Sequence, residues 1–257
     1  MLAAPMLADF AVRLAFGLSL AAVLISWRRV PLLFFRTQAQ IILGLFVLAA
    51  LDQARAGGTG IPFWTIVVGA SLAYVSSIAW GLGLPALAVW TAGLSAVAAM
   101  SWLFHASQGP EVLLIAANTT SRAASGFLLG ATLCSMLLGH YYLTAPAMTI
   151  DPLKRTISLI GWGLVARALL AGAALTIVQA GLVNPVSSAA DPDALVLLFG
   201  RWGMGFVAAG IGTYMTWKTA LIRSTQSATG ILYITMIFVC FGELSSLVLS
   251  GRAGVIC

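Results

Sequence analysis

Four charged residues lie well inside long apolar runs, more than four residues from either end, where a charged group is costly and needs a partner. Arg13, Arg167, Arg201 and Glu243 are each flanked mainly by apolar residues. A guanidinium group donates a planar fork of hydrogen bonds that suits carboxylates and other anions, and a glutamate can accept a proton. These residue types predict a polar ligand-binding site centred on Arg201 and Glu243, to which Arg167, Arg13 and the neighbouring Trp202 contribute.

Each of these residues also has a purely structural interpretation. Arg13 and Arg122 lie near enough to the ends of their runs for their side chains to reach lipid phosphates. Arg201 and Glu243 equally suit an ion pair that joins two helices without binding a ligand. Arg167 lies near the middle of its run, so it must face the protein interior and find a carboxylate, a carbonyl or a cofactor there.

The two histidines of the chain offer a different chemistry. His140 lies in the sequence Gly-His-Tyr-Tyr near the end of an apolar run, and His105 closes another run. A neutral imidazole can ligate haem iron or hydrogen-bond a quinone, and it can equally lie at a membrane interface with a water partner. The predicted spans place the two histidines on opposite membrane faces, about 30 Å apart. We therefore do not expect one haem to be bound by both, whereas a quinone remains a candidate ligand.

The composition determines which elements must position these side chains. The chain has 257 residues, of which 61% are hydrophobic and 8% are charged. Soluble domains are about 25% charged, so this composition excludes a soluble globular enzyme and a disordered chain. A spanning helix needs about 20 apolar residues, and eight runs reach that length. The predicted spans are residues 8–27, 32–51, 61–81, 84–104, 123–143, 156–178, 194–217 and 228–249.

The sequence therefore predicts an all-α, polytopic bundle, with residues 1–257 as a single transmembrane domain. A transmembrane barrel would need shorter segments of alternating polarity, and these runs are continuously apolar. The first run lacks a basic segment before it, so we expect it to be retained rather than cleaved as a signal peptide. The segment Glu111–Arg122 is too polar after its first turn to cross, and it is interpreted as an outer-surface helix that leads into the fifth span. The longest hydrophilic stretch is Asn184–Asp193.

Glycines and cysteines in the runs predict packing rather than chemistry. Gly126 and Gly130 form a GxxxG pattern, which lets two helices approach closely. The glycines between Gly200 and Gly210 also indicate packing, and they could loosen the seventh span. Cys134 and Cys240 are interpreted as small hydrophobic side chains, because no histidine or cysteine lies at metal-ligand spacing from them.

The basic residues predict the orientation of the bundle. Basic residues favour the cytoplasmic side of a membrane, so the net charge of +6 is interpreted as a topology signal and not as a nucleic-acid footprint. With the N-terminus outside, two basic residues, Arg55 and Arg252, lie in outer segments and seven lie in inner ones. The seven are Arg28, Arg29, Arg36, Lys154, Arg155, Lys218 and Arg223. The pattern predicts an N-out/C-out topology, and the composition favours a bacterial inner membrane.

No catalytic motif is present: the sequence has no P-loop, HExxH, GxSxG or strand-linked GxGxxG pattern. Three functions fit the chain. The first is a membrane subunit of a respiratory or photosynthetic-type electron-transfer complex, with a quinone or lipid-like ligand among the buried arginines and Glu243. The second is a transporter or exporter of a small anion. The third is a structural or assembly subunit without a ligand. The expected partners are the lipid bilayer and other membrane subunits.

Overall fold

Every regular element in the described part of the chain is a helix. The computed structural model describes residues 6–107, 112–145, 148–179 and 192–253, together with the turns between their helices. The elements are α1 (Met6–Leu24), α2 (Leu32–Arg55), α3 (Ile61–Gly81), α4 (Pro85–Ala106), α5 (Val112–Thr144), α6 (Asp151–Gln179), α7 (Pro192–Phe199), η1 (Gly200–Ala208), α8 (Ala209–Leu221) and α9 (Thr225–Ala253). The last stretch before α8, η1, is a π-helix. Because α7, η1 and α8 are continuous, they form one span.

Eight of these helical segments are long and apolar enough to cross a membrane, as predicted. The predicted and observed bounds differ mainly at the helix ends. The largest difference is at α5, which begins at Val112: the expected surface helix does lead into the fifth span, and it is continuous with that span as one helix. Thr119 and Thr120 donate hydrogen bonds to the carbonyls of Ile115 and Ala116, so their hydroxyls are satisfied within the helix. Glu111 and residues 184–191 lie outside the described residues.

Proline and glycine determine where several helices begin and turn. Pro31 precedes α2, and Pro62 and Pro85 lie in the first turns of α3 and α4, where a missing N–H costs no helical hydrogen bond. Gly57 and Gly83 adopt φ angles of 74° and 71° in the turns after α2 and α3. A side chain would strain this left-handed conformation, so glycine permits these short connections.

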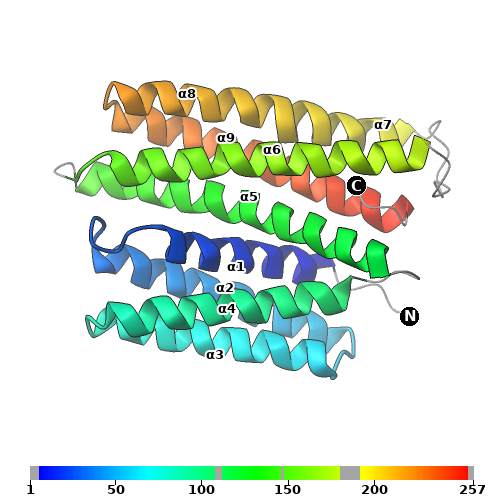
Figure 1. Cartoon of the computed structure of the whole chain (residues 1–257), viewed down its shortest axis with the longest axis horizontal. Helices are drawn as coiled ribbons and strands as arrows, with labels where there is room; N and C mark the ends of the chain where they lie inside the picture. Colours follow the sequence, from blue (N-terminus) through cyan, green and yellow to red (C-terminus); the bar gives the residue numbers. More distant parts are fainter. Residues whose placement is uncertain (1–5, 108–111, 146–147, 180–191, 254–257) are drawn as a thin grey trace.

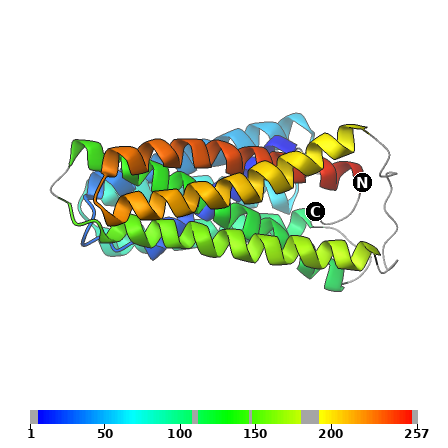
Figure 2. The same cartoon turned by 90° about the horizontal axis from the view of Figure 1, so that it is seen from above.

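The helices form two groups that lie side by side. Helices α1–α4 pack together as one group, which we call the N-terminal half, and α5–α9 form the C-terminal half (Figure 1). The main contact between the halves is that of α1 with α5. A view from above shows the helices of both halves running roughly parallel to one long axis (Figure 2). This common axis is the one along which the bundle would cross a bilayer.

The two ends of the bundle differ in charge. At one end, α1 begins and α9 ends; we call it the terminal end (Figure 1). At the opposite end lie the turns that follow α1, α3, α5 and α8. This opposite end carries the seven basic residues assigned by sequence to the inner side, including the exposed Arg28 and Arg29, and we call it the basic end. Arg55 lies at the terminal end.

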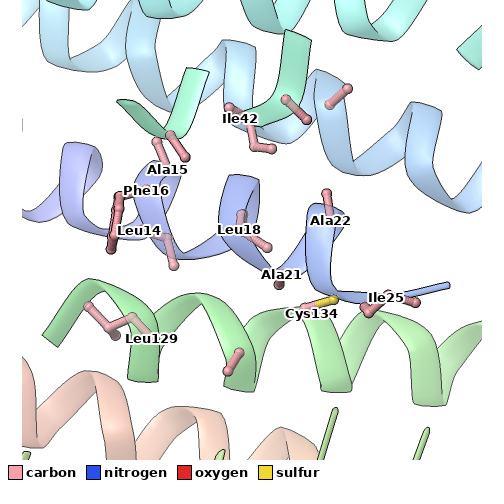
Figure 3. Packing of buried hydrophobic residues seen from close by; sticks show 14 of the residues in the cluster. Leu14, Ala15, Phe16, Leu18, Ala21, Ala22, Ile25, Ile42, Leu129 and Cys134 are labelled. Carbon is pink, nitrogen blue, oxygen red and sulfur yellow. The ribbon is translucent and has the colours of Figure 1, made fainter. Parts of the chain in front are cut away.

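Helix α1 is the most enclosed of the eight spans. It lies between α5 on one side and α2 and α4 on the other, and Leu14, Leu18 and Ala21 are among its core residues (Figure 3). Gly17 of α1 meets the backbone of Gly126 and Gly130 on α5, so the two helices touch without intervening side chains. The GxxxG pattern therefore marks a packing face, as predicted.

The outward faces of the spans are apolar. Trp90, Trp162 and Phe199 expose 74%, 70% and 71% of their surface. Soluble proteins do not present many large apolar side chains in this way, whereas a lipid-facing surface requires them. The eight apolar spans and their apolar outer surface indicate an integral membrane protein in contact with a lipid bilayer.

Candidate functional site

A buried ion pair joins two helices in the C-terminal half. Arg167 of α6 donates from Nε to Glu243 Oε1 of α9 at 3.0 Å, and from Nη2 to Oε2 at 3.2 Å. The two side chains expose only 1% and 6% of their surface. A forked contact of this kind is stronger and more directional than a single hydrogen bond between neutral groups.

Serine hydroxyls complete the hydrogen bonding of this pair. Ser121 accepts a hydrogen bond from Arg167 Nη1 at 2.9 Å, and Ser246 accepts one from Nη2 at 2.8 Å. Ser125 donates to Glu243 Oε2 at 2.5 Å. All three serines are buried. A buried charge is tolerated when its partners are in place, so these hydroxyls help to hold the ion pair inside the bundle.

A second ion pair connects the network to α1. Asp9 and Arg13 lie one turn apart on α1, with Arg13 Nη2 at 2.7 Å from Asp9 Oδ2. Arg13 Nη1 also lies 3.4 Å from Ser125 Oγ, which links this pair to Glu243. Arg122 of α5 donates to Asp9 Oδ1 at 3.3 Å and is 23% exposed. Two arginines therefore share the Asp9 carboxylate.

Arg201 enters the network from the π-helix η1. Its Nη1 donates to Ser246 Oγ at 2.6 Å, and its guanidinium carbon lies 5.9 Å from the centre of the Phe206 ring. Trp202 is half-buried and packs against the same ring, with the ring centres 5.1 Å apart. Gly205 of η1 and Gly242 of α9 are in backbone contact, so the π-helix lies directly against the helix that carries Glu243.

We refer to the connected set as the polar network. Its members come from α1, α5, α6, η1 and α9, so both halves of the bundle contribute. They are Asp9, Arg13, Ser121, Arg122, Ser125, Arg167, Arg201, Glu243 and Ser246. A π-helix inside a span frequently marks a functional position, and ionisable groups inside a membrane do so by default. The polar network combines both features.

The structure brings four of the predicted site residues together, with one change in their pairing. Glu243 pairs with Arg167, and Arg201 reaches it through Ser246 rather than directly. The predicted span ends at residue 249, whereas α9 extends ten residues beyond Glu243 to Ala253. Glu243 therefore lies farther from the end of its helix than predicted, at the same level along the bundle as Arg167, which it contacts.

The histidines lie apart from the polar network and from each other. His105 is exposed in the last turn of α4 at the terminal end. His140 is exposed near the end of α5 at the basic end, where its Nδ1 lies 3.4 Å from the Tyr233 hydroxyl. Because α4 ends at the terminal end and α5 at the basic end (Figure 1), the two histidines lie at opposite ends of the bundle, in agreement with the sequence prediction. No three His, Cys, Asp or Glu side chains gather into a metal-binding group in the ranges that the structure describes.

Asp9 and the three serines of the polar network are not among the predicted site residues. The spacing of the serines along their helices is a signal that could have identified them. Ser121 and Ser125 are four residues apart on α5, and Glu243 and Ser246 are three apart on α9. Residues at these spacings share one helix face, so each pair could have been predicted to face the arginines.

Comparisons of the chain with protein-family models, with curated proteins and with solved structures find no match. The function must therefore be inferred from the chemistry of the polar network. That chemistry combines a buried carboxylate able to exchange a proton, guanidinium groups able to polarise an oxygen atom, and hydroxyls able to orient both.

Proposed function

We propose that this chain is an integral membrane subunit of an electron-transfer complex of the respiratory or photosynthetic type. In this proposal the polar network binds the head group of a quinone or a similar lipid-like ligand, which reaches it from the bilayer. The single observation that carries the proposal is the placement of Glu243, a carboxylate buried among three helices and held by Arg167 and Ser125. A quinol needs such a proton acceptor where it is oxidised.

The groups of the network have separate roles in this proposal. Glu243 accepts a proton from the quinol hydroxyl, and the quinol electrons pass to a redox partner in another subunit. Arg167 and Arg201 polarise the quinone oxygens. Asp9 is a second carboxylate, closer to the terminal end, and Arg13 connects it to the Ser125 hydroxyl. Arg13 orients Asp9 and Ser125 but cannot carry the proton, because a guanidinium group does not lose its own.

A transporter or exporter of a small anion is the second candidate. It is favoured by the local charge at α1, where Arg13 and Arg122 share one carboxylate, Asp9. An anion entering from the terminal end would meet this pair of arginines first. A structural or assembly role without a ligand is the third candidate, and the complete pairing of Arg167 with Glu243 supports it. The experiment below separates the three.

Quinone binding can be tested on the purified chain in lipid nanodiscs with a photoreactive short-chain benzoquinone. We expect cross-links on α5, η1 and α9 at the polar network, mapped by mass spectrometry. Glu243→Gln keeps the shape of the side chain but removes its proton acceptor, and we expect it to weaken binding about tenfold, which corresponds to about 1.4 kcal/mol. Asp151→Asn, which changes an exposed acid at the basic end, is the matched control and should bind normally.

Cross-links spread evenly over the apolar surface, or undiminished in Glu243→Gln, would contradict the quinone proposal. Uptake of an anion into proteoliposomes by the isolated chain would then favour the transporter. The structural role predicts neither binding nor uptake, and it predicts a lowered yield of the assembled complex for an Arg201→Ala, Glu243→Gln double variant. Thermal unfolding of each variant is measured in parallel, so that loss of folding is recognised.

We further propose that the basic end faces the cytoplasm of a bacterium, with both ends of the chain on the outer side of its inner membrane. The charge difference between the two ends supports this orientation. Alkaline phosphatase, which is active only outside the cytoplasm, should be active when fused after Cys257 and inactive when inserted at Ser224. A fluorescent protein should give the reverse result. Phosphatase activity at Ser224 would invert the proposed orientation.

A further inference from the structure

A small cavity lies within the N-terminal half, away from the polar network. It is lined by residues of α1, α2, α3 and α4. The space within which the centre of a water molecule can move is about 10 Å³. Its walls include three serines and a stacked aromatic pair: Ser19, Ser76, Ser95, Phe35 and Trp80. All five side chains are buried. A cavity of this size holds about one water molecule.

One polar atom of the cavity wall has no hydrogen-bond partner among the described residues. It is the hydroxyl of Ser19, a side chain that is 0% exposed. A buried polar atom without a partner costs about 1–3 kcal/mol, so this hydroxyl favours a bound ligand that can pair with it.

The other two serines can also contribute to this ligand. Ser76 donates to the Ala88 carbonyl at 3.0 Å, and Ser95 donates to the Gly69 carbonyl at 3.4 Å. Their protons are used in these bonds, so their oxygens remain as acceptors. The Ser19 hydroxyl is available as a donor. A ligand that both donates and accepts therefore matches the cavity, and buried waters typically make about three hydrogen bonds.

We propose that this cavity is an internal hydration site that holds one water molecule between Ser19, Ser76 and Ser95. An apolar ligand would leave the Ser19 hydroxyl unsatisfied, and no carboxylate lines the cavity to balance a cation. The site is independent of the proposed quinone function. It lies six residues from Arg13 along α1, about 9 Å, toward the basic end. Helix α1 thus carries buried polar side chains on both sides of its midpoint.

X-ray radiolytic footprinting tests the bound water directly, because hydroxyl radicals formed from a trapped water label the side chains that touch it. Phe35 lines the cavity, whereas Phe46 is equally buried on the same helix and does not. In the full chain in nanodiscs we expect Phe35 to be labelled several-fold faster than Phe46. We expect this excess to fall in Ser19→Ala. Equal labelling of the two phenylalanines would overturn the proposal.

The direction in which Ser19→Ala changes the melting temperature provides an independent test. If Ser19 holds a water, its removal takes a hydrogen bond from the site and should lower the melting temperature. If the cavity is dry, the substitution removes an unsatisfied hydroxyl and should raise it. Ser71→Ala, at an exposed hydroxyl of α3, is the control and should change little. An unchanged or raised melting temperature of Ser19→Ala would overturn the proposal.

Discussion

Replacing Arg167 with methionine is expected to lower the free energy of unfolding by about 3–5 kcal/mol. The substitution leaves the Glu243 carboxylate buried and takes away the guanidinium that contacts both of its oxygens. An uncompensated charge in a low-dielectric interior is far more costly than the loss of one surface contact. Denaturant or thermal unfolding of the purified protein in detergent measures this change.

A double variant shows whether the loss arises from the stranded charge. Arg167→Met combined with Glu243→Leu removes both charges, and buried ion pairs replaced by apolar side chains often retain stability. We therefore expect the double variant to be more stable than the single one, even though it loses the proposed quinone contact. Arg155→Met, at an exposed position of the same helix, is the control. A single variant as stable as this control would show that Arg167 does not stabilise the fold.

The second large effect is expected at the contact between α1 and α5. Gly130→Ala places a methyl group against the backbone of Gly17, where no flexible side chain can move aside. The two helices must separate, and we expect a loss of stability of about 2–3 kcal/mol or more. Because the link from Arg13 to Ser125 crosses this interface, separation should also weaken the connection between the two halves of the polar network.

A glycine in open space provides the matched control for this prediction. Gly161 of α6 has no atom within 4 Å of the position that a Cβ would occupy. Gly161→Ala should be neutral or stabilise the protein by up to about 1 kcal/mol, because alanine favours the helix. Similar melting temperatures for Gly130→Ala and Gly161→Ala would show that the close backbone contact does not limit stability.

The sequence predicts the eight spans well because the membrane imposes a simple length and polarity requirement on each. Helix ends are harder to predict, since threonines such as Thr119 and Thr120 satisfy their hydroxyls on their own helix and allow it to continue. An error of this kind at α9 ended the predicted span at residue 249, before the observed helix end at Ala253. Hydropathy reports how apolar a window is. It does not show whether a polar residue ends a helix or forms its hydrogen bonds within the helix and lets it continue.

The pairing within the candidate site was predicted only in part for a related reason. Each further residue turns a helix side chain by about 100°, so the choice between Arg167 and Arg201 as the partner of Glu243 depends on rotation and not on depth alone. The glycines of span seven suggested a loosened helix, and the structure has a π-helix there. Its altered turn changes which side chains face α9, and no periodicity rule for regular helices anticipates that change.

The two ion pairs of the polar network also differ in when they can form during biogenesis. Asp9 and Arg13 lie on the same helix, so α1 neutralises its own charges as soon as it folds, before any other span has been synthesised. Arg167 and Glu243 lie on helices separated by the whole of span seven. Synthesis proceeds from the N-terminus, so span six enters the membrane with Arg167 before its partner Glu243 has been synthesised. Membrane insertion of this protein is therefore expected to stall or to need a chaperone at span six, until span eight emerges.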